Sequence, residues 1–310
     1  MAVVLITGGT GLIGSNLTRR LIERNHEVIV LSRDRSKNTE NQKMQYAYWN
    51  IGKQVIDKSA FMKADHIVHL AGAGVMDERW TESYKKEIVE SRTETSKLLI
   101  KYLKETNHHV TSFVSASAIG YYGDDTKMMN DGGFVESDPP DKSFLGDTSV
   151  KWEKSVDPVK DLGIRLCKLR TGIVLGNDGG AYPEFKQPVK FGIAAILSSG
   201  KQMVSWIHID DLCSIYMDCI FLEKMHETYN AVAPFPVTNK ELTITIAEAI
   251  RSKFYIPVHV PEFVLKLMLG QKSIEILKSA TVSAGKILET AFRFEYPTID
   301  LAIADLTGKD

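Results

Sequence analysis

Three glycines near the start of the chain constrain its fold more than any other feature. Gly8, Gly11 and Gly14 follow an apolar segment at 3–8 and open a segment of helical periodicity, and a second apolar segment lies at 26–33. In such a G-x-x-G-x-x-G turn the first glycine permits a tight bend, the second lets the backbone approach a pyrophosphate, and the third lets helix and strand pack closely. The pyrophosphate then lies on the amides at the positive end of the helix. A glycine-rich turn without a ligand is the alternative, but the flanking strands and helix favour a dinucleotide-binding unit.

Apolar segments of strand length recur along the first half of the chain, separated by segments of helical periodicity. They lie at 3–8, 26–33, 65–72, 110–117 and 164–176. Near-continuous apolar strands that alternate with helices indicate a parallel sheet covered on both faces. We therefore predict the α/β class, with a Rossmann-type doubly wound parallel sheet and a smaller α+β C-terminal region. Ligands of this fold bind at the carboxyl ends of the strands.

One long helix is predicted at 83–105, because its apolar residues fall largely on one face. These residues are Ile88, Thr95, Leu98, Leu99 and Leu103. After residue 176 the pattern loosens, and the C-terminal part looks helical, with breaks at Pro257, Pro261 and Gly270. We predict a nucleotide-binding Rossmann domain at 1–175 and a substrate-side and C-terminal domain at 176–310, whose segments cover the cleft of the first domain or add to it.

Composition narrows the class of partner. The 38 Lys and Arg residues balance 39 Asp and Glu residues, so recognition of nucleic acid or of an anionic membrane by bulk charge is not expected. Cys167, Cys213 and Cys219 form no C-x-x-C pair and predict neither a disulfide framework nor a thiolate zinc site. No apolar run reaches the roughly 20 residues of a membrane span, and the N-terminus lacks the basic region of a signal peptide. We expect a cytoplasmic protein with a small-molecule substrate and no metal.

The end of the second strand indicates which adenine ribose is bound. An Asp or Glu there would hydrogen-bond the 2′-hydroxyl of NAD, but this chain has Ser32 and Arg33. A guanidinium pairs with a 2′-phosphate and a serine hydroxyl donates to it, whereas an acid would repel it. The pair predicts NADP(H) as the cofactor. An arginine that only lies on the surface is the alternative, and the Asp34 and Arg35 that follow keep it open.

Several further motifs carry a resemblance to a known family. The chain resembles the extended short-chain dehydrogenase/reductases, the group that includes sugar-nucleotide epimerases. The resemblance lies in the segments TGGTGLIG, HLAG (69–72) and SASAIGYYG (115–123). Further segments resemble one atypical branch of this group, the "epimerase family proteins" with an uncharacterised C-terminal domain. These segments are RWTESYKKEIVESRTETSKLL, KWE, LRTGIVLGNDGGAY, SWIHIDDL and YNAVAP. The resemblance covers nearly the whole chain and is specific to about residue 235.

The resemblance implies a set of cofactor contacts. They are Gly8, Gly11, Leu12, Ile13 and Gly14 at the first turn, Ser32 and Arg33 at the 2′-phosphate, Leu70, Ala71 and Gly72 near the nicotinamide half, and Glu87 and Arg92 on the long helix. From the residues alone, Glu87 and Arg92 would be solvated surface charges, because five positions do not stack as an i,i+4 pair. The resemblance also implies a homodimer formed through the long helices.

The usual catalytic tyrosine of such dehydrogenases is missing. Their proton acceptor is a tyrosine four residues before a lysine, helped by a nearby serine. Ser117 ends a predicted strand and is the serine candidate, although it could also be a strand-end cap. Lys151 is the lysine candidate for the nicotinamide ribose, or an exposed helix lysine, and Asp147 stands where the tyrosine is expected. Tyr121 or Tyr122 could replace the lost phenol or could simply pack.

His208 is a further titratable candidate, with Asp210 or Asp211 expected to cap the helix after it. Two functions follow. The first is an NADP(H)-dependent oxidoreductase or epimerase that acts on a small polar substrate, such as a carbonyl or nucleotide-sugar compound. The second is a catalytically inactive NADP(H)-binding regulatory protein. The missing tyrosine favours the second; Ser117, Lys151 and the intact glycine turn favour the first, and we prefer the enzyme.

Overall fold

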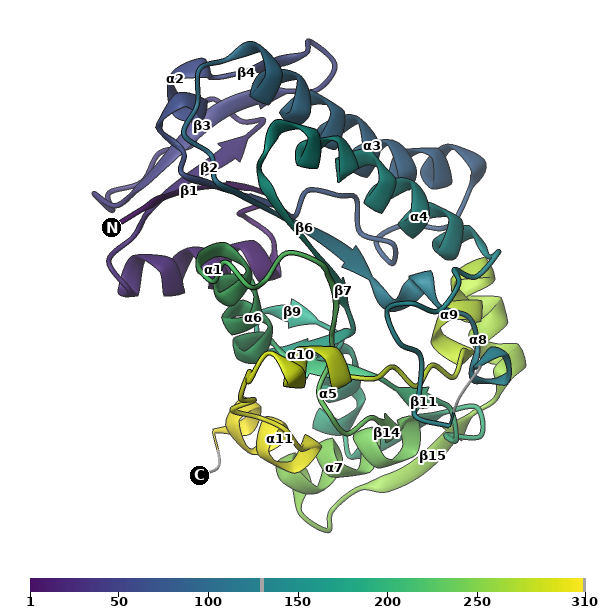
Figure 1. The fold of residues 1–310 in the computed structure, drawn as a ribbon. Helices are drawn as coiled ribbons and strands as arrows, with labels where there is room; N and C mark the ends of the chain where they lie inside the picture. Colours follow the sequence, from purple (N-terminus) through teal and green to yellow (C-terminus); the bar gives the residue numbers. More distant parts are fainter. Residues whose placement is uncertain (129–130, 309–310) are drawn as a thin grey trace.

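A computed structural model describes residues 1–128 and 131–308, and its centre is a twisted sheet (Figure 1). In this part of the chain the sheet has the strand order β13-β7-β6-β5-β1-β2-β3-β4, and all pairs are parallel except β3 with β4. The strands are β1 Val3–Thr7, β2 Glu27–Ser32, β3 Met44–Asn50, β4 Val55–Ile56, β5 His66–His69, β6 Ser112–Ala118, β7 Arg165–Thr171 and β13 Thr228–Ala231. The order reverses between β1 and β5, which places the ligand crevice at their carboxyl ends. The predicted Rossmann-type fold is confirmed.

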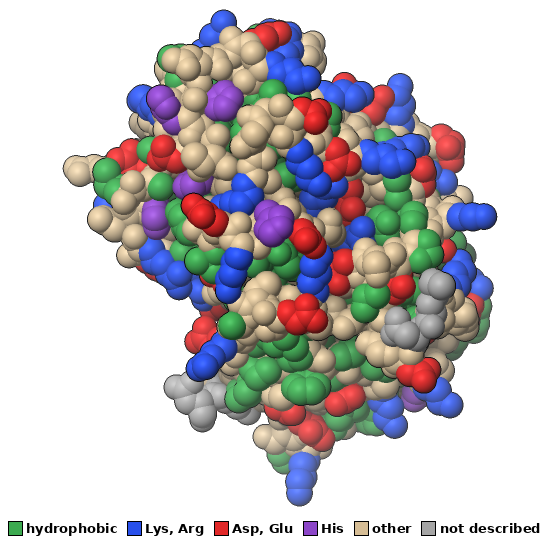
Figure 2. All heavy atoms as spheres, in the orientation of Figure 1, with side chains coloured by type: hydrophobic (Ala, Val, Ile, Leu, Met, Phe, Trp, Pro, Cys, Tyr) green, Lys and Arg blue, Asp and Glu red, His purple; other side chains and the backbone are tan. Residues whose placement is uncertain are grey.

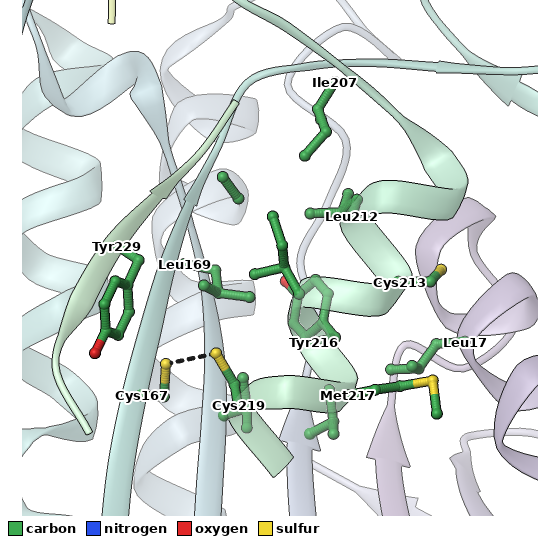
Figure 3. Packing of buried hydrophobic residues seen from close by; sticks show 14 of the residues in the cluster. Leu17, Cys167, Leu169, Ile207, Leu212, Cys213, Tyr216, Met217, Cys219 and Tyr229 are labelled. Atoms are coloured by element: carbon green, nitrogen blue, oxygen red, sulfur yellow. Dashed lines mark hydrogen bonds between the residues drawn. The ribbon is translucent and has the colours of Figure 1, made fainter. Parts of the chain in front are cut away.

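Helices cover both faces of this sheet, as continuous apolar strands require. One face carries α1 (Leu12–Glu23) and α6 (Ile209–Phe221), and the other carries α2 (Lys58–Lys63), α3 (Glu82–Glu105) and α4 (Phe144–Val156). Figure 3 shows how α6 fills the first face: Leu212, Tyr216 and Cys219 point toward Cys167 and Leu169 of β7. The predicted long helix is confirmed, because its five predicted apolar-face residues are all buried.

The C-terminal part forms a second, smaller layer around its own apolar cluster (Figure 1). Its helices are α5 Tyr182–Lys190, α7 Asn239–Arg251, α8 Glu262–Leu269, α9 Ser273–Leu277, α10 Gly285–Glu289 and α11 Ile299–Thr307. Its short strands are β8 Ile173–Gly176, β9 Gly179–Gly180, β10 Ile193–Leu197, β11 Met203–Val204, β12 Trp206–His208, β14 Val237–Thr238 and β15 Ile256–Val260. This region lies beside the carboxyl ends of the central strands, where a substrate would meet a cofactor.

The structure corrects three details of the sequence prediction. The run at 164–176 is two strands in different sheets, β7 and β8, which are separated by Gly172, where a Cβ would lie 2.6 Å from the Ser205 oxygen. Strand β3 was not predicted. Pro257 lies within β15, in a two-stranded sheet where the edge position tolerates a residue without an N–H.

The proposed division at residue 175 stays a prediction, and the chain returns to the first layer after it. Strand β13 pairs with β7 at the edge of the central sheet, and α6 packs against α1. Lys and Arg side chains intermingle with Asp and Glu on the face seen in Figure 2. Within residues 1–128 and 131–308, none of the helices combines the length and apolar character needed to cross a bilayer. The homodimer and the cytoplasmic location stay predictions.

Candidate functional site

Two glycines of the first turn are required by the protein's own packing. Gly8 has a φ of +68°, and a Cβ on it would lie 2.9 Å from the Leu70 carbonyl carbon. A Cβ on Gly14 would lie 2.4 Å from the Gly8 oxygen, inside any van der Waals contact. The turn between β1 and α1 therefore excludes side chains at both positions and brings Gly8 against Leu70 and Ala71.

Gly11 is different, because its missing side chain leaves open space. A Cβ there would meet only the Gly8 oxygen, at 3.5 Å. Gly11 is the N-cap of α1 and offers no side-chain hydrogen bond, and the first turn, with Leu12 and Ile13, holds no acidic residue. The first amides of a helix lack intrahelical partners and carry the positive end of the helix dipole. The exposed surface above Gly11 can thus receive a pyrophosphate, as the glycine pattern predicts.

The end of β2 presents a serine and a free cation. Ser32 is buried, and its Oγ accepts the Asp34 N–H at 3.1 Å. Arg33 is exposed and forms no ion pair or side-chain hydrogen bond in the part of the chain that is described. Both stand at the sheet edge where the adenine ribose of a dinucleotide lies in this fold.

A buried polar contact fixes the loop after β5 beside the glycine turn. The Thr7 Oγ1 accepts the N–H groups of Leu70 and Ala71, both at 3.1 Å, and lies 2.7 Å from the His69 Nδ1. Burial lowers the pKa of His69 to about 4, so the ring is neutral. The ring therefore bonds without adding charge, and Leu70, Ala71 and Gly72 are held at the switch point of the sheet.

Arg92 lies next to this loop and lacks a carboxylate partner among the described residues. Its guanidinium lies 4.9 Å from the ring centroid of Trp152 and donates to the Ile88 oxygen at 2.8 Å. It also lies so close to Gly72 that a Cβ on that residue would be 3.1 Å from the guanidinium carbon. Burial lowers its pKa to about 10. A half-buried cation without a carboxylate partner, at the carboxyl edge of the sheet, is suited to an anionic group of a ligand. The Glu87 side chain, one turn earlier, is exposed and bonds to no described side chain.

Ser117 enters a buried network that the sequence did not reveal. Its Oγ donates to the Glu153 Oε1 at 2.7 Å, and Glu153 is held by Arg170 through bonds of 2.8 and 3.0 Å. Arg170 also donates to the Tyr122 hydroxyl at 2.9 Å. All four side chains are buried. Because the single hydroxyl hydrogen of Ser117 goes to Glu153, only its lone pairs remain for a ligand.

The two tyrosines after β6 are held by the same arginine. The Tyr122 hydroxyl donates to the Asn230 Oδ1 at 2.7 Å, and burial raises the pKa of Tyr122 well above its usual range. The ring of Tyr121 stacks under the Arg170 guanidinium, 3.4 Å from ring centroid to Cζ. Tyr122 is thus a structural member of the network, whereas the half-buried Tyr121 stays a candidate.

Lys151 pairs with the residue that stands in place of the missing tyrosine. Its Nζ lies 2.6 Å from the Asp147 carboxylate, one turn away on α4, and both side chains are more than half exposed. An exposed pair of this kind is weak and opens readily. The structure gives Lys151 no contact with Ser117, so these two candidates are not joined before a ligand binds.

His208 has a structural role, and the expected aspartate cap is wrong. His208 is itself the N-cap of α6, and its Nδ1 accepts a hydrogen bond from the Asp210 N–H at 3.2 Å. Asp210 pairs with Arg20 at 2.7 Å, and Asp211 accepts the N–H of Tyr296 at 3.0 Å. Burial lowers the pKa of His208, so a neutral ring can accept at the helix start.

Sequence reasoning overlooked Glu153 and Arg170, although both lie in motifs quoted above. The available indication was the set of three cations, Arg165, Lys168 and Arg170, in the predicted strand IRLCKLRTG, because a cation that a strand buries needs a partner. Within residues 1–128 and 131–308, no three His, Cys, Asp or Glu side chains are grouped to hold a metal ion.

Known proteins similar to this chain share this architecture. Residues 4–231 match the NAD dependent epimerase/dehydratase family, and residues 260–306 match a domain of unknown function. An epimerase family protein of Staphylococcus saprophyticus is 33% identical over 302 residues, covering 97% of this chain and 98% of its own. The crystal structure of a human epimerase family protein with NADPH has a TM-score of 0.84 and 28% identity, covering 99% of both chains. A UDP-glucose 4-epimerase of Thermus thermophilus in complex with NAD has a TM-score of 0.75 at 19% identity, covering 99% of both chains, and is similar in fold alone.

Proposed function

The chain belongs to the NAD dependent epimerase/dehydratase family, and from this premise we propose that it is an NADP(H)-dependent oxidoreductase or epimerase of the extended short-chain dehydrogenase type. Its substrate would be a small polar compound such as a carbonyl or nucleotide-sugar compound. The observation that carries the proposal is the open space over Gly11 at a helix start without acidic residues. Nothing in the packing of the protein requires a glycine there, whereas a pyrophosphate on the helix amides does.

Ser32 and Arg33 support NADP(H) over NAD(H). An exposed arginine without a carboxylate partner among the described residues keeps its donors for a 2′-phosphate, and the Asp34 carboxylate that follows is engaged by the N–H and hydroxyl of Ser36. The human relative was crystallised with NADPH, whereas the more distant Thermus epimerase was crystallised with NAD.

Each residue of the site then has a defined task. The amides that follow Gly11 bind the pyrophosphate, Arg33 pairs with the 2′-phosphate, and Arg92 faces a further anionic group of the cofactor. Thr7 and His69 hold the loop that carries Leu70, Ala71 and Gly72 against the glycine turn. When bound, NADP(H) supplies or accepts a hydride at its nicotinamide.

Ser117 and Lys151 would work at the reacting end. Ser117 is oriented by Glu153 so that its oxygen accepts a hydrogen bond from a substrate hydroxyl. Lys151 would hold the nicotinamide ribose after release from Asp147, which the exposure of the pair permits. Tyr121 is the remaining side chain proposed to reach a substrate.

A catalytically inactive NADP(H)-binding regulatory protein is the second candidate. It is favoured by the state of the reacting end, where Lys151 is closed on Asp147 and the hydrogen of Ser117 is committed to Glu153. In that arrangement Ser117 has no hydrogen to donate to a carbonyl substrate. The cofactor turn is common to both candidates and cannot separate them.

Titration of nucleotide-free protein with NADPH and NADH by fluorescence tests the shared part of the proposal. We expect tight NADPH binding and weaker NADH binding, and equal weak binding of both would contradict it. The NADPH complex is then mixed with a panel of carbonyl compounds, while NADPH absorbance is followed. Oxidation on any of them supports the enzyme; tight binding without turnover across the panel supports the regulatory protein.

A further inference from the structure

An open-sided surface cavity of about 430 Å³ lies beyond the end of β2, and the functions above do not use it. Its lining includes Arg35, Lys37, Tyr46, Tyr48 and two aspartates, Asp34 and Asp57. Two cations and two aromatic rings around one cavity, at the sheet edge where an adenine ribose lies, suggest a role in binding an anion.

Strand pairing brings this cavity to the ribose site. In the parallel register of β2 and β3, Ser32 is the direct partner of Tyr48. The Arg35 guanidinium lies over the Tyr48 ring, 4.0 Å from the ring centroid, so the ring holds this cation close to the end of β2. Lys37 lies over Tyr46 in a looser contact of 5.5 Å. Parallel pairing thus adds a positioned cation to the two residues already assigned to the 2′-phosphate.

The nearby carboxylates accept hydrogen bonds from neutral groups and are not ion-paired with these cations. Arg33, Arg35 and Lys37 form no ion pair among the described residues. The Asp34 carboxylate is turned onto Ser36, accepting its N–H at 2.8 Å and its hydroxyl at 2.7 Å.

The second aspartate of the cavity is also engaged. The Asp57 carboxylate caps α2 by accepting the N–H groups of Ser59 and Ala60, at 2.9 and 3.4 Å. With Arg33 at the end of β2, three cations stand beside these two carboxylates, and none of the three is ion-paired among the described residues, so their donors remain available to a doubly charged phosphate.

We propose that Arg35 is a second binding residue for the 2′-phosphate of the cofactor and that Tyr48 is the positioning residue that holds its guanidinium in place. This inference rests on the proposed NADP(H) function. A planar guanidinium can offer two parallel N–H donors to phosphate oxygens, and its five N–H groups exceed what the contact of Arg35 with the Tyr48 side chain uses. Two arginines, Arg33 and Arg35, would then set the preference for NADPH over NADH.

Binding of matched ligands to Arg35→Ala tests the proposal. The probes are NADPH against NADH, and adenosine 2′,5′-bisphosphate against adenosine 5′-monophosphate, because each pair differs by the 2′-phosphate alone. Loss of one charge-assisted hydrogen bond should weaken binding of NADPH and of the bisphosphate about tenfold or more, and leave NADH and the monophosphate unchanged. Arg251→Ala, which removes an exposed arginine from the end of α7, is the charge-matched control.

The position of Tyr48 is tested by two variants. Tyr48→Phe keeps the ring under the guanidinium and should retain the NADPH preference, whereas Tyr48→Leu should lower it without changing the affinity for NADH. A purely structural role would weaken both nucleotides alike in Tyr48→Leu.

The outcomes separate this inference from the proposed function. An unchanged NADPH-to-NADH ratio in Arg35→Ala, with the ratio lost in Arg33→Ala, overturns the role of Arg35 and keeps the NADP(H) assignment. Equal weakening of NADPH and NADH in Arg35→Ala also overturns it. If the wild-type protein does not prefer NADPH to NADH, the assignment of NADP(H) itself fails, and the role of Arg35 fails with it.

Discussion

Replacing Gly11 by valine tests the cofactor site without disturbing the fold. The added Cβ would meet only the Gly8 oxygen, at 3.5 Å, and the backbone at Gly11, with φ −82° and ψ 175°, suits any residue. Loss of glycine at an N-cap that has no side-chain bond should cost about 1 kcal/mol or less. The melting temperature should fall by about 2 to 4 °C at most.

Binding of NADPH should suffer far more than stability. The valine methyl groups would occupy the space over the helix start, and at least two amide bonds to the pyrophosphate would be lost. Charge-assisted hydrogen bonds contribute roughly 1.5 to 3 kcal/mol each, so affinity should fall roughly a hundredfold to ten-thousandfold.

The assay pairs thermal unfolding with NADPH titration by fluorescence on the same preparation. Gly52→Val, in the exposed turn between β3 and β4, is the control and should bind NADPH normally. If Gly11→Val is folded and binds NADPH with the wild-type Kd, the reading of this turn as a pyrophosphate site is refuted. Gly14→Ala cannot serve as a test, because its Cβ would lie 2.4 Å from the Gly8 oxygen and destabilise the protein.

Three further perturbations follow from the site. Arg33→Asp should weaken NADPH binding about tenfold or more and shift preference toward NADH; isothermal titration that gives equal affinities before and after would refute the 2′-phosphate role. Glu153→Gln leaves the Arg170 guanidinium buried without a carboxylate and should destabilise the fold by about 3 to 5 kcal/mol, measured by urea unfolding. The buried His69 has a pKa of about 4, below the usual value of about 6.5, so the unfolded chain takes up the proton first. Stability should therefore decline, by up to about 3 kcal/mol from this residue, as pH falls from about 6.5 to about 4, and His69→Asn should flatten that decline in urea unfolding at stepped pH.

Local patterns were sufficient to predict the central fold. Apolar strands alternating with helices and the three spaced glycines predicted the parallel sheet and its nucleotide edge, because each of these signals is contained in a short stretch of chain. Strand β3 escaped prediction because it is half exposed, and the polar and aromatic residues of MQYAYWN do not form an apolar run. Its neighbour β4 has only two residues.

The residues at the cofactor end of the site could also be predicted from the sequence, because their signals are local. The glycine turn and the Ser32–Arg33 pair belong to one strand-helix-strand unit of about 30 residues, so their relation in space follows from the local fold. Arg92 was named through the resemblance, and the structure places its guanidinium beside Gly72 and Trp152, without a carboxylate partner among the described residues.

What the sequence by itself determined is the fold class, the nucleotide edge and the absence of a tyrosine at position 147. Tertiary structure alone decided what surrounds Ser117, because Glu153 arrives on a helix and Arg170 on the neighbouring strand β7, and no local pattern encodes that meeting. It also placed Arg35 on Tyr48, because the parallel register of β2 and β3 sets Tyr48 beside Ser32, three positions before Arg35. The sequence determines which residues are neighbours along the chain. A buried charge such as that of Glu153 needs a partner, however, and folding supplies it from a distant segment, here Arg170.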